Sequence, residues 1–318
     1  MRVLKIASVI LSCGLVVIFA FWIGLKISDR IVDGAQPVVS ENANQNSENI
    51  PDPLAYNPPN MDAVPEGPDG DAIKRGYKIV NETNSVLDGY VGNKLSCSSC
   101  HAGAGLEQSV SPLVGVTAKY PQYRPREGKI MSIEDRINGC MVRSMNGKEI
   151  PENSADMRAI VSYLSYISKG IPTGEPELPW LGQNKMKNVP KPNVNDGDSL
   201  YKQSCVACHA ADGSGTNTNS GPALWGNNSF NDGAGLSRLT QLAGYIQRNM
   251  PAGQAGSLTN QQAVDLAAFI LSKDRPEWKG HNKDWPNGGK PNDVIDKKKR
   301  EQIKKGTINW DDVLKEAQ

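Results

Sequence analysis

Apolar residues recur at helical spacing in two separate stretches of the chain. In the first stretch, a short helix is expected around Ile73–Val80, and longer helices should begin near Ser132 and Ser154. Ser132 and Asp135 form a capping-box pattern, in which each side chain bonds the backbone N–H of the other residue. The pattern after Ser154 continues at helical spacing until Gly170, where a glycine stops it.

The second stretch repeats this order of elements. A short helix should contain Leu200 and Tyr201, and a longer one should run from Leu239 to Met250, where Pro251 ends it. The last apolar pattern predicts a helix over Asn260–Leu271. The two stretches share an architecture but little sequence identity, which indicates an internal duplication of a helical domain.

The N-terminal segment is typical of an exported protein. Arg2 and Lys5 precede the uncharged run Ile6–Leu25, which is as long as the ~20 residues that span a bilayer. Basic residues before the run place the N-terminus in the cytoplasm and the bulk of the chain outside. We favour an uncleaved signal anchor over a cleaved signal peptide that would leave a soluble periplasmic protein. The proline- and asparagine-rich residues 31–69 predict a disordered tether.

Composition leaves room for a prosthetic group. The 318 residues are 38% hydrophobic and 6% aromatic, a lean supply of apolar side chains that a large flat group could supplement. The net charge of +1 creates no field that favours nucleic acid, so we expect no nucleic-acid partner. We expect the basic run Lys297–Arg300 to form a solvated helix face.

Two Cys-x-x-Cys-His motifs identify that group. Their residues are Cys97, Cys100 and His101 in the first, and Cys205, Cys208 and His209 in the second. This pattern attaches haem c through two thioethers, and the histidine binds the iron. The alternatives are a redox disulfide or half of a zinc site, but zinc needs further ligands and the chain has only 3 histidines. We therefore predict two covalently bound haems c.

With the haem motifs placed, the chain divides into six segments. These are a signal anchor or transmembrane helix (1–30), a linker (31–69), a first cytochrome c domain (70–170), an interdomain strap (171–192), a second cytochrome c domain (193–275) and a C-terminal extension (276–318). The predicted fold is mainly α, with two cytochrome c-type helical domains in tandem. It should lie on the extracytoplasmic face of the inner membrane.

The sixth position of each iron is predicted from residues downstream of each motif. For the second haem, the methionine at a helix end is Met250, and thioether ligation raises a haem's potential. In the first domain, Cys140 follows His101 at nearly the same interval. Met141, Met145 and Met157 compete with it, and an open position is a further alternative. An unpaired cysteine in an exported protein is prone to oxidation unless it is buried or used.

Arginines cluster around Cys140. They are Arg124, Arg126, Arg136 and Arg143. If a helix begins near Ser132, then Arg136, Cys140 and Ser144 share one of its faces. Guanidinium forks suit dianionic oxyanions, which indicates an anion-binding pocket. Pairing with haem propionates and plain surface exposure are the alternatives.

Three segments resemble the periplasmic thiosulfate dehydrogenases, dihaem cytochromes that also act as tetrathionate reductases. The segments are Ile133–Gly147, Asp156–Gly170 and Asp284–Asp293. The block R-I-N-x-C-x-x-R-S-x-N-G in the first of them is the most specific, and the resemblance covers roughly residues 70–295. It implies that the first haem is the active site and that the second passes electrons on.

The resemblance also implies roles for individual residues. The matching iron ligands are His101 and Cys140 for the first haem, and His209 and Met250 for the second. The matching substrate contacts are Arg126, Arg136, Ser144 and, in the loop after the first motif, Gln108.

The implied reaction joins two thiosulfates into tetrathionate and releases two electrons to a soluble or membrane-bound redox partner. Two rival interpretations remain. One is a non-catalytic dihaem electron carrier, in which the arginines pair with propionates. The other is a cytochrome subunit of a larger dehydrogenase or sulfur-oxidising complex.

Overall fold

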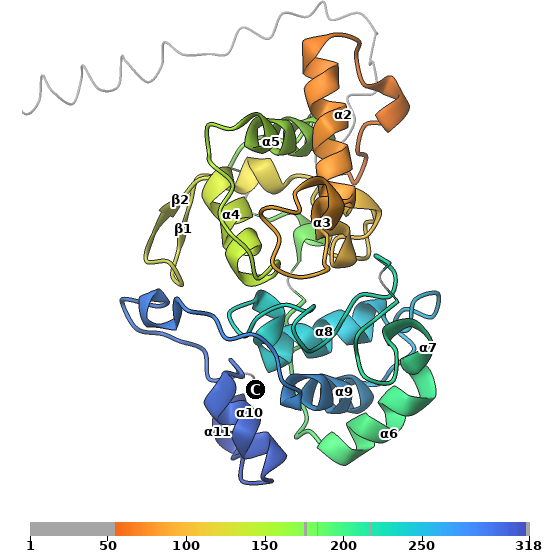
Figure 1. Cartoon of the computed structure of the whole chain (residues 1–318), viewed down its shortest axis with the longest axis vertical. Coiled ribbons are helices and arrows are strands. Elements are labelled where there is room, and N and C mark those ends of the chain that lie inside the picture. The colour runs from red at the N-terminus through yellow and green to blue at the C-terminus, as the bar shows by residue number, and fades with distance from the viewer. Residues whose placement is uncertain (1–54, 175–176, 183, 217, 316–318) are drawn as a thin grey trace, which may run out of the picture. The chain divides into compact units, whose positions relative to one another are not determined.

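The computed structural model describes residues 55–315 except 175–176, 183 and 217, all within one compact unit, Asp52–Gln318 (Figure 1). The predicted membrane anchor (1–30) lies outside the described residues. Within the described part of the chain, no helix combines the length and apolarity needed to cross a membrane.

Helices dominate the described residues. They are α2 (Pro68–Asn81), α3 (Thr83–Val86), α4 (Ile133–Arg143), α5 (Ala155–Ile167), α6 (Val194–Ser204), α7 (Val206–His209), α8 (Leu239–Asn249), α9 (Asn260–Ser272), α10 (Lys297–Lys304) and α11 (Trp310–Leu314). Strands β1 (Gln122–Arg124) and β2 (Lys129–Met131) pair in an antiparallel hairpin. The helices predicted within the two haem-motif domains are all present. The hairpin was not predicted, because three-residue strands carry too little alternation to be seen in a sequence.

Each haem-motif domain is built on the same helix crossing. In the first domain α2 packs against α5, and a Cβ on Gly76 would lie 2.0 Å from the carbonyl oxygen of Ala159. In the second, α6 packs against α9, and a Cβ on Gly197 would lie 2.1 Å from the carbonyl oxygen of Asp265. Glycine is therefore required at both crossings, where two helix backbones approach closely. The shared geometry supports the predicted duplication.

The prediction of a disordered tether over residues 31–69 is wrong for its described end. Tyr56 stacks edge-on against Trp180 at 5.3 Å between ring centroids, and its hydroxyl donates to the carbonyl of Leu106 (2.6 Å). Val64 is buried, and the carbonyl of Asn60 accepts a hydrogen bond from a tyrosine of α5. The apolar surface that these side chains bury outweighs the disorder that the prolines suggest.

The basic run of the C-terminal extension also departs from prediction. Lys297 is exposed and pairs with Glu277, as a solvated helix face requires. Arg300, however, is 2% exposed and pairs with Asp232 beneath the helix. The run therefore belongs to an amphipathic helix whose inner face packs on α9, with Ile303 also buried.

Helix α4 begins at the capping box that the sequence predicts. The Ser132 hydroxyl accepts from the backbone N–H of Asp135 (3.1 Å), and the Asp135 carboxylate accepts from the N–H of Ser132 (3.0 Å). We expect Ser132→Ala to lower the free energy of unfolding by about 1 kcal/mol, because the helix loses this cap. Thermal unfolding of the holoprotein measures the loss. Ser109→Ala, at an exposed loop position, is the control and should stay within about 0.5 kcal/mol of wild type. Equal melting of both variants would show that the cap does not hold α4.

Candidate active site

Both motif histidines are held in the form that binds iron. His101 Nδ1 lies 2.5 Å from the carbonyl oxygen of Ser111, and His209 Nδ1 lies 2.8 Å from that of Pro222. Each ring therefore donates through Nδ1, which leaves Nε2 as the ligating atom. Burial lowers the pKa of both histidines, and the neutral imidazole is the ligating form.

The motif cysteines complete two haem-attachment sites. The first motif begins with a 3-10 turn, Cys97–Ser99, and the second leads from α6 into the short helix α7. Among the described residues every cysteine is free of disulfides, so both sulfur pairs are open to thioether bonds. Burial raises the pKa of the Cys97 thiol to about 11, which favours the neutral form of this sulfur. Two sulfurs and an oriented neutral imidazole at each motif fit haem c.

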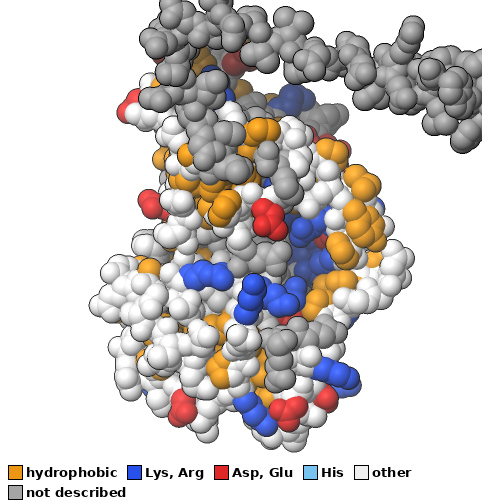
Figure 2. Space-filling view, turned by 180° about the vertical axis from the view of Figure 1, so that it is seen from behind, with side chains coloured by type: hydrophobic (Ala, Val, Ile, Leu, Met, Phe, Trp, Pro, Cys, Tyr) orange, Lys and Arg blue, Asp and Glu red, His pale blue; other side chains and the backbone are white. Residues whose placement is uncertain are grey.

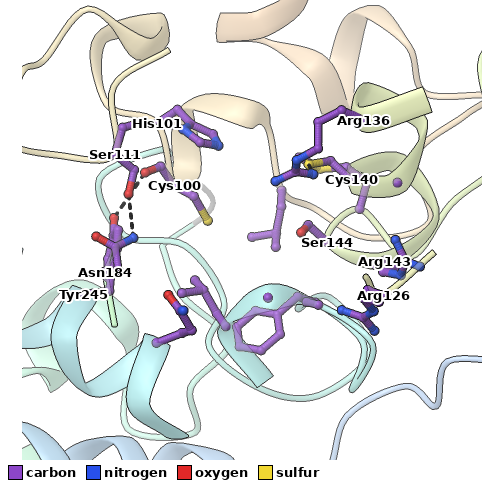
Figure 3. Close-up of a pocket in the computed structure, with 18 of the residues that line it drawn as sticks. Cys100, His101, Ser111, Arg126, Arg136, Cys140, Arg143, Ser144, Asn184 and Tyr245 are labelled. Atoms are coloured by element: carbon purple, nitrogen blue, oxygen red, sulfur yellow. Dashed lines mark hydrogen bonds between the residues drawn. The ribbon is translucent and has the colours of Figure 1, made fainter. Parts of the chain in front are cut away.

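A cavity of about 270 Å³ lies beside the first motif. The predicted residues that line it are Cys100, His101, Arg126, Arg136, Cys140 and Ser144. Figure 3 shows His101 and Cys140 on opposite sides of this space, with Cys100 on the same side as His101. The cavity lining therefore offers both an imidazole and a cysteine sulfur to a group attached at this motif.

The sulfur of Cys140 is paired with a cation. Arg136 Nη1 donates to Cys140 Sγ at 2.7 Å from one helical turn earlier on α4. The charge of Cys140 is the main reason that the pKa of Arg136 lies above its usual range. Of the competing sulfurs, Met141 is 2% exposed in the hydrophobic core and does not line the cavity, whereas Met145 does. Helix α4 thus presents Cys140 to the cavity and turns Met141 away from it.

Two further arginines of the cluster, Arg126 and Arg143, are held by carboxylates, and Arg124 also lines the cavity. Arg126 Nη2 donates to Asp284 (2.7 Å), and Arg143 donates through Nη1 to Glu127 and through Nη2 to Asp284 (2.9 Å each). Arg126, Glu127 and Arg143 all line the cavity, while Asp284 is 3% exposed behind them. The pocket therefore contains both positive and negative side chains. Ser144, at the C-terminal cap of α4, also lines it.

Gln108 is not brought into the site. It is exposed and does not line the cavity. The Leu113 N–H donates to the Gly105 carbonyl (2.8 Å) and closes the base of a loop. Gln108 lies in the exposed part of this loop, beyond that hydrogen bond. The glutamine that lines the cavity is Gln241, from α8 of the second domain.

Sequence reasoning also missed two residues from beyond the first domain. Asn184 of the strap donates to Ser111 Oγ (2.9 Å), and Ser111 is the residue whose carbonyl orients His101. Tyr245 of α8 lies 3.5 Å from the Cys100 carbonyl, and burial raises its pKa. Figure 3 shows both side chains beside Ser111 and Cys100. No signal near the first motif marks residues that arrive from a different domain.

Met250, the predicted ligand of the second haem, is at the end of α8. It caps the C-terminus of α8, is partly buried and packs against the core. The adjacent Asn249 is 4% exposed, and both its amide atoms lack hydrogen-bond partners. Orphaned buried polar atoms are rare in folded proteins, and they fit a site that a bound group completes.

Two family matches cover the two haem motifs. Residues 90–173 match the SoxA/TsdA cytochrome c domain, and residues 192–270 match the domain described as cytochrome c oxidase, cbb3-type, subunit III. The predicted mainly helical fold with two cytochrome c domains in tandem is confirmed, and the protein carries two covalently bound haems c.

Similar proteins extend over most of the chain. It is 42% identical over 241 residues to a thiosulfate dehydrogenase of Psychrobacter arcticus, covering 74% of this chain and 73% of the relative. It is 37% identical over 234 residues to a thiosulfate dehydrogenase of Allochromatium vinosum, covering 71% and 86%. Among solved structures, the as-isolated thiosulfate dehydrogenase of Marichromatium purpuratum matches with a TM-score of 0.66 and 33% identity over 69% of this chain. The match covers 49% of that solved chain, about half its length.

Proposed function

Because the chain belongs to the thiosulfate dehydrogenase family, we propose that it joins two thiosulfates into tetrathionate and delivers the two released electrons to a soluble or membrane-bound redox partner. The family makes the protein an oxidoreductase that acts on thiosulfate. In reverse, the same site would reduce tetrathionate. The cytochrome c domains support a periplasmic or extracytoplasmic location.

The observation that carries the proposal is the pairing of Cys140 with Arg136 in an arginine-lined cavity opposite His101. A plain electron carrier needs saturated, inert iron ligands and has no use for a cavity. A cysteine sulfur held beside a guanidinium offers substrate sulfur a soft partner within an anion-binding site. We propose that His101 and Cys140 would hold the iron of the first haem.

The arginines address the main electrostatic obstacle to the reaction. Two dianions at 4 Å repel each other by about 4 kcal/mol even in water, since each of the four unit-charge pairs costs about 1 kcal/mol. Arg126 and Arg136 can offset this repulsion as the two sulfurs approach, and Ser144 can donate a further hydrogen bond. Basic side chains also gather about a hollow on the face seen in Figure 2, which would favour the approach of an anion.

Haem c bound at the two motifs would supply one-electron redox chemistry, and the proposed function has electrons pass from the cavity of the first motif to the second motif and on to the partner. We assign His209 and Met250 as the ligands of the second haem. The chain orients both proximal imidazoles through the carbonyls of Ser111 and Pro222. His209 is buried, and His101 is partly buried where it lines the cavity.

Turnover measurements test the proposal. The purified dihaem protein should oxidise thiosulfate with ferricyanide as acceptor and reduce tetrathionate with reduced viologen as donor. A protein that retains both haems but turns over neither substrate would be an electron carrier, and the proposed function would be wrong.

We expect Met250→Leu to lower the potential of the second haem on the order of 0.1 V, because the thioether ligand that raises it is lost. Spectroelectrochemical titration measures the change, and the second haem should also lose its low-spin methionine-ligated spectrum. Met186→Leu is the matched control, since Met186 is a buried methionine of the strap. Equal potentials in both variants would remove Met250 as a ligand.

A further inference from the structure

The C-terminal extension places a buried carboxylate against the arginines of the first domain. Asp284 is 3% exposed, and its two oxygens accept from two different guanidiniums, Oδ2 from Arg126 and Oδ1 from Arg143. Arg143 has both terminal nitrogens on carboxylates, because Glu127 takes the other one. Arg143 is thereby committed to the protein, whereas Arg126 uses one terminal nitrogen, Nη2, on Asp284.

The segment that carries Asp284 is fastened to the hairpin beside the cavity. The Trp285 N–H donates to the Arg126 carbonyl (2.7 Å), and the indole of Trp285 stacks on the Arg126 guanidinium at 4.7 Å. A Cβ on Gly128 would lie 2.5 Å from Pro286, so the turn between β1 and β2 fits closely against this segment. Trp285 has a φ of 54°, a left-handed conformation that a bulky residue keeps only where its surroundings impose it.

Both ends of this segment return to the second domain. The Asp232 N–H donates to the Pro276 carbonyl, and Arg238 pairs with Val294 in a β-bridge. Figure 1 shows the extension passing from α9 to the hairpin and back to α10. The side chain of Arg126 is thus anchored to an element that the second domain holds in place.

Burial makes the Asp284 contact important for Arg126. Desolvation lowers the pKa of Arg126, and the charge of Arg143 lowers it further, while the bond to Asp284 opposes both effects. Two buried guanidiniums that share one carboxylate would move apart without it, because their charges repel. The aim of Arg126 into the cavity depends on this shared carboxylate.

We propose that Asp284 is a positioning residue for thiosulfate: by bridging Arg126 and Arg143 it fixes the guanidinium that receives the anion, so the C-terminal extension completes the substrate pocket. The inference rests on the proposed function for the identity of the substrate. The positioning role predicts the direction in which anion binding changes when Asp284 is replaced. If Asp284 served only to reduce positive charge, its removal would strengthen anion binding, whereas loss of positioning weakens binding.

The test compares four holoproteins: wild type, Asp284→Asn, Asp284→Glu and Asp293→Asn. The last is a matched control, because Asp293 is also a buried carboxylate of the extension but pairs with Arg238 away from the cavity. Isothermal titration with sulfate, a dianion that is not oxidised, measures binding without turnover. Thiosulfate kinetics with ferricyanide give KM and kcat.

We expect Asp284→Asn and Asp284→Glu to weaken sulfate binding and raise the KM for thiosulfate by about tenfold or more, since small misplacements of a binding group are costly. Asp293→Asn should change both values by no more than about threefold. Tighter sulfate binding by Asp284→Asn, or values within about threefold of wild type for both Asp284 variants, would overturn the proposal.

Two further outcomes of the experiment also have a defined meaning. If Asp284→Asn does not fold with both haems, Asp284→Glu decides by the same measurements, because it keeps the charge and moves the carboxylate. If wild type binds sulfate with the expected variant pattern but does not oxidise thiosulfate, the proposed function fails and the positioning role stands.

Discussion

A Cys140→Ala variant is expected to lose thiosulfate turnover by on the order of 10²–10³-fold while retaining both covalent haems. The attachment cysteines and His101 are separate from α4, so haem attachment does not depend on Cys140. The loss follows because the cavity keeps Arg136 but loses the sulfur that this guanidinium faces at 2.7 Å. Steady-state oxidation of thiosulfate with ferricyanide measures the effect.

The matched control is Met145→Leu, which alters the other predicted sulfur that lines the cavity. Met145 is 4% exposed, and leucine preserves its apolar volume, so we expect turnover within a few-fold of wild type. Low-spin EPR provides the second measurement: Cys140→Ala should lose the compressed g-spread of a thiolate-ligated haem, and Met145→Leu should keep it. The reverse pattern would assign Met145 as the ligand and contradict the role of Cys140.

Local patterns predicted the parts of the site that a single element carries. The capping box at Ser132 sets the start of α4, and helical spacing then brings Arg136 and Cys140 together one turn apart. These predictions succeeded because the interacting atoms are a few residues apart, so the geometry of one turn determines their contact.

Residues that converge from distant segments could not be predicted in this way. Asn184, Gln241 and Tyr245 reach the first-haem cavity from the strap and the second domain, and Asp284 reaches its arginines from the extension. Their positions depend on how two domains pack, which no local period encodes. Gln108 illustrates the converse error: it is close to His101 in sequence, but a loop closed at its base leaves it exposed.

An Asp232→Asn variant is expected to lower the free energy of unfolding by about 3–5 kcal/mol, the cost of removing one partner from a buried ion pair. Asp232 is 1% exposed and accepts from the Trp278 N–H (2.7 Å), His281 Nε2 (2.8 Å) and Arg300 Nη2 (3.5 Å). Arg275 is also buried nearby, and desolvation together with Arg300 holds its pKa below the usual range. Asparagine would leave these two cations without the carboxylate that offsets their repulsion.

Thermal unfolding of the holoprotein measures this loss, which corresponds to a fall in Tm of about 6–20 °C at about 2–4 °C per kcal/mol. Asp265→Asn is the matched control, because Asp265 is 4% exposed but accepts through Oδ1 from the Asn193 N–H and the Gln261 amide. Asparagine keeps that oxygen, so we expect a change within about 1 kcal/mol.

The control also has a pH dependence of known sign. Burial raises the folded-state pKa of Asp265 above 3.8, so the fold penalises its ionisation. The stability that Asp265 contributes is therefore greatest at low pH and declines as the pH rises from the unfolded pKa through the folded one. Asp265→Asn removes this decline, and its stability relative to wild type should improve over that window.

An Asp232→Asn loss no larger than that of Asp265→Asn would show that the buried arginines do not depend on Asp232.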